Sequence, residues 1–214
     1  MIGDALAYPL KGTGKYILVI GAILSLLLSV GAYVPVLGLI LGIGASGFFS
    51  AYMFKVINAT ACGHDEACDW PDFQDFFSDL VVPWLCMLSA SFFSFGPYAG
   101  VSFMSEEEGP LSIVLLLLGF VHFPMSILCV AICGTMRSAF WATMVPLIIR
   151  CLPQYLVLVL VLGGLSIINS LLNTVLSNIP FLGWFISFFL GMYSLMVTGR
   201  LIGLFNRENS HLIG

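Results

Sequence analysis

The side chains best suited to metal binding lie between residues 62 and 68. Cys62, His64 and Cys68 stand beside Asp65 and Glu66, and thiolates, imidazoles and carboxylates are the usual ligands of zinc. Structural zinc sites commonly place two cysteines two to four residues apart and take a second ligand pair from elsewhere in the chain. Here five residues separate the two cysteines. We therefore predict no metal site and no cofactor, although the pattern leaves open whether Cys62, His64 and Cys68 bind a metal.

A second group of polar side chains falls inside long apolar segments. His122 lies in one such segment, and Asn169 and Asn173 lie four residues apart in another, so the two amides share a helical face. In lipid, polar groups of this kind mark either a functional site or a hydrogen-bonded contact between helices. His122, Asn169 and Asn173 are the candidate intramembrane polar face, and packing contacts are the favoured interpretation.

A third group is acidic and alternates with aromatic residues between positions 69 and 80. The pattern predicts an amphipathic helix that Asp69 caps and that lies in the plane of the lipid headgroups. Its acids form a candidate cytoplasmic face for a basic partner, with a simply solvated face as the favoured alternative. These acids are Asp69, Asp72, Asp75 and Asp79.

No set of residues with the spacing of a catalytic site is found in the sequence. It contains neither a zinc-protease HExxH pattern nor a Gly-rich phosphate-binding loop. The acidic cluster Glu106–Glu108 has no neighbouring histidine or cysteine. We therefore expect no catalytic residues and no enzymatic activity.

The composition indicates which elements must position these residues. Of 214 residues, 60% are hydrophobic and only 8% are charged, whereas soluble domains carry roughly 25% charged residues. Lipid must therefore be the solvent for most of the chain. The net charge of −4 excludes nucleic acid as a partner, because no basic surface is available to neutralise phosphates.

Apolar runs of about 20 residues predict an all-α, polytopic integral membrane protein that forms a single membrane domain over residues 1–214. The six expected transmembrane helices cover residues 15–33, 35–57, 80–104, 111–133, 154–176 and 181–203. Residues 58–79 are expected to form a loop and the interfacial amphipathic helix. Residues 134–153 contain two arginines and two prolines, which favours an interfacial or re-entrant segment over a seventh span.

The distribution of cations predicts the orientation. With six spans, all seven lysines and arginines lie on one side or at span ends that face it. The positive-inside rule makes that side cytoplasmic, which places both termini in the cytoplasm and the chain in the inner membrane. The cations are Lys11, Lys15, Lys55, Arg137, Arg150, Arg200 and Arg207. None is expected at the centre of a span.

Three short segments carry a family resemblance. The run from Trp70 to Leu80 with the following Pro83, the segment Pro146–Leu156, and the ending Gly199–Arg207 resemble an uncharacterised family of bacterial polytopic membrane proteins, a domain of unknown function. That family is distantly similar to the Yip-type membrane proteins. The resemblance implies no catalytic residues, because none are assigned in the family.

Together these features predict a non-enzymatic structural or accessory subunit, or scaffold, of a membrane assembly. Its expected partners are the lipid bilayer and other membrane protein subunits or copies of itself. The alternative is a small transporter or channel for a small molecule or lipid, with a path near Pro97, His122 and the asparagine pair. The absence of a charge at any span centre weighs against ion-coupled transport.

Overall fold

Helices make up nearly all of the chain that the structure, a computed structural model, describes: residues 2–31, 35–70, 75, 77–104, 109–179 and 182–213. No β-strand occurs in these ranges. Two short 3₁₀ helices (Tyr8–Leu10 and Met136–Ala139) and one π-helical turn (Phe77–Val81) accompany the longer elements. The α-helices are α1 (Ile2–Ala7), α2 (Gly14–Gly31), α3 (Pro35–Ala61), α4 (Val82–Met104), α5 (Pro110–Cys133), α6 (Trp141–Arg150), α7 (Leu152–Leu176) and α8 (Leu182–Ile213).

Five helices in the described ranges are long and apolar enough to cross a membrane, which confirms an all-α polytopic architecture. They lie in Gly38–Ala61, Phe77–Met104, Pro110–Cys133, Leu152–Leu176 and Leu182–Leu212. The segment predicted at 15–33 corresponds to α2, of which Gly14–Leu26 is an apolar stretch shorter than a span within the residues whose side chains are described. The five helices are therefore the spans that the described residues support directly.

Local sequence signals set the ends of several helices. Pro110 begins α5, where a missing backbone N–H costs nothing, and Gly134 ends it with a positive φ of 64°. The last helix is longer than predicted: α8 continues ten residues beyond the expected end at 203, to Ile213. The Asn209 amide donates a hydrogen bond of 2.9 Å to the Phe205 carbonyl near the bend at that residue.

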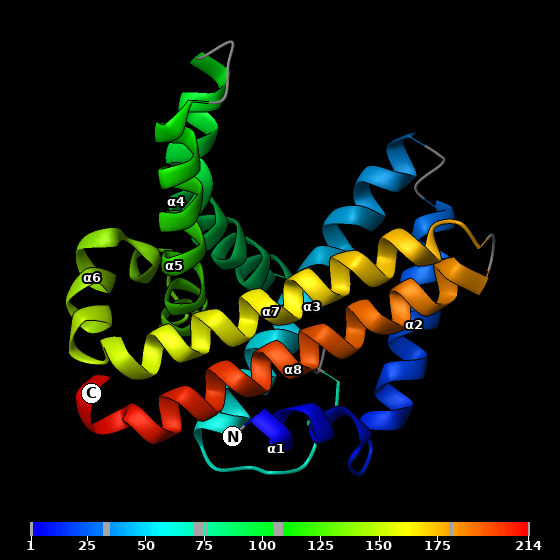
Figure 1. Ribbon diagram of the computed structural model, residues 1–214. Coiled ribbons are helices and arrows are strands. Elements are labelled where there is room, and N and C mark those ends of the chain that lie inside the picture. The colour runs from blue at the N-terminus through cyan, green and yellow to red at the C-terminus, as the bar shows by residue number, and fades with distance from the viewer. Residues whose placement is uncertain are drawn as a thin grey trace.

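The long helices form three hairpins, α2–α3, α4–α5 and α7–α8, whose turns point away from a common base (Figure 1). The base consists of α1, the loop 62–70, α6 and the C-terminal half of α8. Away from the base, the α4–α5 hairpin diverges from the other two hairpins (Figure 1). The core therefore lies near the base, where α3 and α8 pack against each other.

Two glycines allow α3 and α8 to approach closely. A Cβ atom on Gly203 would lie 2.5 Å from the Cβ of Thr60 and 2.8 Å from the carbonyl oxygen of Ile57. A Cβ atom on Gly199 would lie 3.1 Å from a methyl carbon of Val56. In lipid, where no hydrophobic force drives helix association, such close backbone approach is a main source of packing energy.

The amphipathic helix predicted from residue 69 falls largely on residues 71–74 and 76, which lie outside the described residues. Residues 62–70 form a loop, and the π-helical turn Phe77–Val81 leads directly into α4. The Asp75 carboxylate accepts the Phe77 N–H at 3.0 Å, and the Asp79 carboxylate accepts the Asp75 N–H at 3.0 Å. This pair of carboxylates satisfies free N–H groups at the start of the π-helical turn that leads into α4.

The segment 134–153 contains the 3₁₀ helix Met136–Ala139 and the ten-residue helix α6. Such a helix spans about 15 Å, half of a bilayer core. This length agrees with the expectation that the segment does not cross the membrane.

Candidate functional site

The most connected polar group in the described structure is Arg200, which was expected at a span end and instead lies buried within α8. Its side chain has no solvent exposure. This burial was not anticipated from the sequence, which predicted only that Arg200 lies at a span end and that no cation lies at a span centre.

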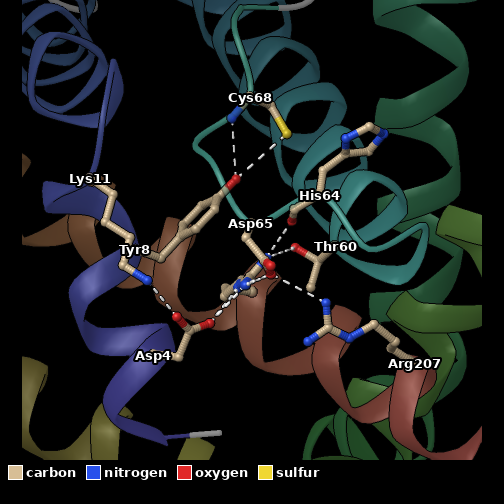
Figure 2. A network of polar contacts seen from close by, with 9 residues as sticks. Asp4, Tyr8, Lys11, Thr60, His64, Asp65, Cys68 and Arg207 are labelled. Carbon is tan, nitrogen blue, oxygen red and sulfur yellow. Dashed lines mark hydrogen bonds and ion pairs between the residues drawn. The ribbon is translucent and has the colours of Figure 1, made fainter.

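All five N–H groups of the Arg200 guanidinium donate hydrogen bonds, which is the full capacity of an arginine (Figure 2). Nε and Nη2 donate to Asp4 Oδ2 at 3.1 and 2.7 Å, and Nη2 also donates to Asp65 Oδ1 at 2.7 Å. Nη1 donates to the His64 carbonyl at 2.6 Å and to Thr60 Oγ1 at 3.4 Å. One side chain therefore joins α1, α3, the loop 62–70 and α8.

The position of Arg200 follows from the helix packing. It lies between Gly199 and Gly203, so the close approach of α3 brings Thr60 and the end of α3 against the guanidinium. A larger residue at position 203 would separate the two helices and withdraw Thr60. The glycine spacing and the arginine thus act together.

Tyr8 closes the network on the side of the N-terminal segment. The guanidinium carbon of Arg200 lies 5.0 Å from the centre of the Tyr8 ring, within the range of a cation–π contact. The Tyr8 hydroxyl accepts the Cys68 backbone N–H at 3.2 Å and lies 3.5 Å from its sulfur (Figure 2). The Tyr193 hydroxyl donates to the Leu6 carbonyl at 2.7 Å. These contacts attach α1 to α8 through Leu6, and they attach the following 3₁₀ helix to the loop 62–70 through Tyr8.

Two further cations form ion pairs with the two aspartates. Lys11 Nζ lies 2.5 Å from Asp4, and an Nη atom of Arg207 lies 3.2 Å from Asp65. The hydrogen bonds from Lys11 and Arg200 lower the pKa of Asp4 to about 2, and those from Arg200 and Arg207 lower the pKa of Asp65. Burial is the main cause that raises the pKa of Tyr8 above its ordinary value. Both carboxylates are therefore ionised and Tyr8 is neutral at physiological pH.

The polar groups of this network are occupied by one another, so the network acts by holding segments of the chain together. The Arg200 donors are saturated, the carboxylates are engaged by cations, and the Tyr8 hydroxyl is occupied by the loop. A polar cavity of about 280 Å³ lies beside it, lined by Asp4, Lys11, Asp65, Leu204, Arg207 and Glu208. The network fixes the base of the molecule and opposes motion of the N-terminal segment.

Two acids of the candidate acidic face contact the chain near the start of α4. Asp75 and Asp79 accept backbone N–H groups at the start of the π-helical turn that leads into α4, so their carboxylates stabilise this helix end. Asp69 is exposed in the loop, and Asp72 lies outside the described residues. The helix expected to carry this face falls largely outside the described residues, so the face stays a prediction.

His122 is buried between helices and does not join the asparagine pair. Its Nδ1 atom is 2.8 Å from Ser94 Oγ, and its ring stacks on Trp141 at 4.1 Å between centroids. The neighbouring Val121 contacts Tyr155 at the start of α7, fourteen residues before Asn169. Fourteen helical residues span about 21 Å, so His122 and the asparagine pair do not form one compact polar site.

The asparagine pair forms as its spacing predicts. Asn173 Nδ2 donates to Asn169 Oδ1 at 3.2 Å along α7. Both side chains are half-buried.

Cys62, His64 and Cys68 do not converge. Cys62 and His64 are exposed, whereas Cys68 is directed toward Tyr8. Among the described residues, no three histidine, cysteine or acidic side chains are grouped so that they could hold a metal ion.

Sequence reasoning missed the Arg200 network because its partners lie 196 and 135 residues away along the chain. A usable signal was present: a lone arginine inside an apolar segment needs counter-ions, and Asp4 is one of only eleven acidic residues. Comparison of the chain with models of known protein families, with curated proteins and with solved structures found no match.

Proposed function

We propose that the chain is a non-enzymatic subunit or scaffold of an assembly in the cytoplasmic (inner) membrane. The observation that carries this proposal is the saturation of Arg200, which joins four segments into a fixed base. Three apolar hairpins project from that base (Figure 1). A fixed base with projecting apolar helices suits a role in which the membrane-facing surfaces pack against other membrane proteins.

The proposal includes six spans, with α2 as the first, and a cytoplasmic base that carries both termini. Cations gather toward the base: Lys11 and Arg200 belong to its network, and Arg150 ends α6. The positive-inside rule supports a cytoplasmic location for such an end. A reporter fused after Glu108 should then read as extracytoplasmic, and a cytoplasmic signal there would contradict this topology. We also propose, on the motifs given above, membership of the Yip-like bacterial family.

The test of the subunit role is recovery of partners. The full chain, carrying an affinity tag, is extracted in mild detergent, and the polypeptides that accompany it are quantified. Other membrane proteins should be recovered in fixed stoichiometry. Arg200→Met, which loosens the base, should lower that recovery, whereas Arg207→Met, whose side chain is 39% exposed, should not. Purification without any other polypeptide, under conditions that preserve known complexes, would count against a subunit role.

The alternative proposal is a small transporter or channel for a small molecule or lipid. Two observations favour it: the half-buried pair Asn169 and Asn173 on α7, and an apolar cavity of about 350 Å³ between α2, α3 and α8 that includes Phe49, Phe188 and Met192. Cysteines introduced at 169 and 173 should react with a water-soluble maleimide if a polar path exists. Full protection of both positions would exclude that path.

A further inference from the structure

An open cavity of about 580 Å³ lies at the end of α3. Its volume falls within the range of about 300–1,000 Å³ that is typical of small-molecule sites. Among the described residues that line it, only His64 also belongs to the Arg200 network. The polar lining residues come from α3, from the turn after it, and from the π-helical turn before α4. They are Lys55, Asn58, Cys62, His64, Ser78 and Asp79.

The α3 wall of the cavity carries polar side chains on one helical face. Lys55, Asn58 and Cys62 follow one another at intervals of three and four residues, so they share that face. Lys55 Nζ donates to the Trp70 carbonyl at 2.9 Å, and Asn58 Nδ2 donates to the Ala131 carbonyl at 2.9 Å. An ammonium group has three donor hydrogens and an amide nitrogen has two. Each of the two groups is therefore held in place by one bond and keeps donor capacity for a ligand.

The end of α3 fixes His64 at the cavity. Gly63 has a positive φ of 90°, its N–H donates to the Thr60 carbonyl at 3.0 Å, and the His64 N–H donates to the Ala59 carbonyl at 2.9 Å. These two bonds form the Schellman motif that commonly ends a helix at a glycine. The His64 carbonyl accepts from Arg200 at 2.6 Å, whereas its imidazole points away from the Arg200 network (Figure 2). An imidazole carries a ring N–H in either protonation state, so His64 adds a third donor to the cavity.

The second wall of the cavity carries a negative charge. Asp79 lies in the π-helical turn, and its carboxylate accepts the Asp75 N–H at 3.0 Å and the Ser78 hydroxyl at 3.1 Å. These bonds fix the position of the carboxylate, which has about four acceptor sites in all. The cavity thus presents an ammonium and N–H donors on the α3 side and a carboxylate on the other.

We propose that this cavity binds a zwitterionic phosphate ester of the phosphoethanolamine type, with its phosphate toward Lys55 and His64 and its ammonium toward Asp79. Phosphate oxygens accept charge-assisted hydrogen bonds from cationic donors, and an ammonium only donates, so the charges of the two walls orient the ligand. A purely anionic ligand would be repelled by the carboxylate, and a simple cation would be repelled by the lysine. The inference goes beyond the subunit role and does not depend on it.

Two sources supply this chemical group: the headgroup of phosphatidylethanolamine and a soluble phosphoethanolamine ester. The position of the cavity favours the lipid. Its polar lining residues lie near the ends of two candidate spans, Gly38–Ala61 and Phe77–Met104, where a spanning helix leaves the hydrocarbon core. Phe77 and Val82, which flank the second wall in the sequence, are 69% and 43% exposed, and exposed apolar side chains of this kind suit contact with lipid.

Binding to the purified full chain in detergent tests the proposal. Native mass spectrometry counts bound phosphatidylethanolamine, and calorimetric titration with glycerophosphoethanolamine measures the headgroup alone. Lys55→Met should weaken binding by about tenfold or more, because a charge-assisted hydrogen bond is lost, and His64→Ala should weaken it to a smaller extent. The matched controls Lys15→Met and His211→Ala change exposed side chains outside the lining of the cavity and should bind as the wild type does.

The folding of each variant is checked by circular dichroism. His64→Ala removes only an exposed side chain and keeps the backbone bonds of that residue, so this variant should stay folded even if Lys55→Met does not. Unchanged affinity in both cavity variants would overturn the proposal, as would the absence of binding of either compound to the wild type.

Headgroup selection tests the orientation of the ligand. Phosphatidylglycerol, which lacks the ammonium, should bind the wild type more weakly than phosphatidylethanolamine does. Asp79→Asn keeps an acceptor for the Asp75 N–H and should remove this preference. Equal binding of the two lipids by the wild type would overturn the zwitterionic assignment. Binding of the lipid alone would support the site with a membrane lipid as its source, and equal affinity for glycerophosphoethanolamine would support it with a soluble ester.

Discussion

Replacing Arg200 with methionine tests the central role of the network at the base. The substitution keeps an unbranched side chain at a position with no solvent exposure and removes all five donor groups. The groups that accept hydrogen bonds from Arg200 differ in how far water can replace the lost donors. The Asp4 side chain is 35% exposed, so water replaces part of what it loses, whereas the buried Thr60 has no such access.

Two limits bound the free energy that couples Asp4 to Arg200. Removing one partner of a fully buried ion pair costs about 3–5 kcal/mol, and an exposed pair contributes about 1 kcal/mol or less. Here one partner is buried and the other is one-third exposed. We therefore expect a coupling energy of about 2 kcal/mol, between these limits.

A double-mutant cycle measures this coupling. The free energy of unfolding in detergent is determined for the wild type, Asp4→Ala, Arg200→Met and the double variant, and hydrogen exchange reports on the amides of α1. Both single variants should expose the amides of residues 2–10 to faster exchange and leave α4 and α5 unchanged. Arg207→Met is the matched control and should change little. A coupling energy near zero, with unchanged exchange in α1, would refute the reasoning.

Three further predictions concern other contacts. The Tyr155 hydroxyl bridges a carbonyl and an N–H of α5 beside the internal proline of that helix. Tyr155→Phe should therefore lower the free energy of unfolding by about 1–3 kcal/mol. The control Tyr16→Phe changes a side chain that is 71% exposed and should have no such effect, so equal effects of the two substitutions would contradict this prediction. Asp75→Ala should cost about 1 kcal/mol through the lost cap, and a serine there should recover most of it. Because the pKa of Asp4 is lowered from 3.8 to about 2, its stabilisation should be complete above about pH 5 and fade as the pH falls from 4 to 2. Exchange of α1 amides against pH measures this, and Asp4→Asn should weaken the dependence to the part that Asp65, whose pKa is also lowered, contributes.

The membrane helices were predictable because each one consists of a continuous apolar run, and such a run indicates a helix without any contact to the rest of the chain. Residues 111–133 and 154–176 match α5 and α7 within two residues, since Pro110 and Pro153 start the helices at fixed places. The asparagine pair was also predictable, because its contact lies within one helix turn. Contacts between residues this close along the chain can be read from the sequence alone.

The contacts between distant segments were not predictable. Nothing within ten residues of Arg200 indicates that Asp4 lies against it, because only the packing of α3 on α8 brings the N-terminal segment there. Two of the acids between 69 and 79 give a related example. Asp75 and Asp79 accept backbone N–H groups at the start of the π-helical turn Phe77–Val81, a use that the alternation of acids and aromatic residues does not indicate.

The distance along the chain between Asp4 and Arg200 also sets an order of events during synthesis. Their hydrogen bond joins positions 196 residues apart. At about 5–20 residues per second, roughly 10–40 s pass between the addition of Asp4 to the growing chain and the addition of Arg200. During that interval Asp4 cannot form its bond to Arg200, so α1 reaches its final set of contacts only after most of α8 has been translated. A chain that ends before position 200 would keep the contact between Tyr8 and Cys68 but lack the bond that joins α1 to α8 through Arg200.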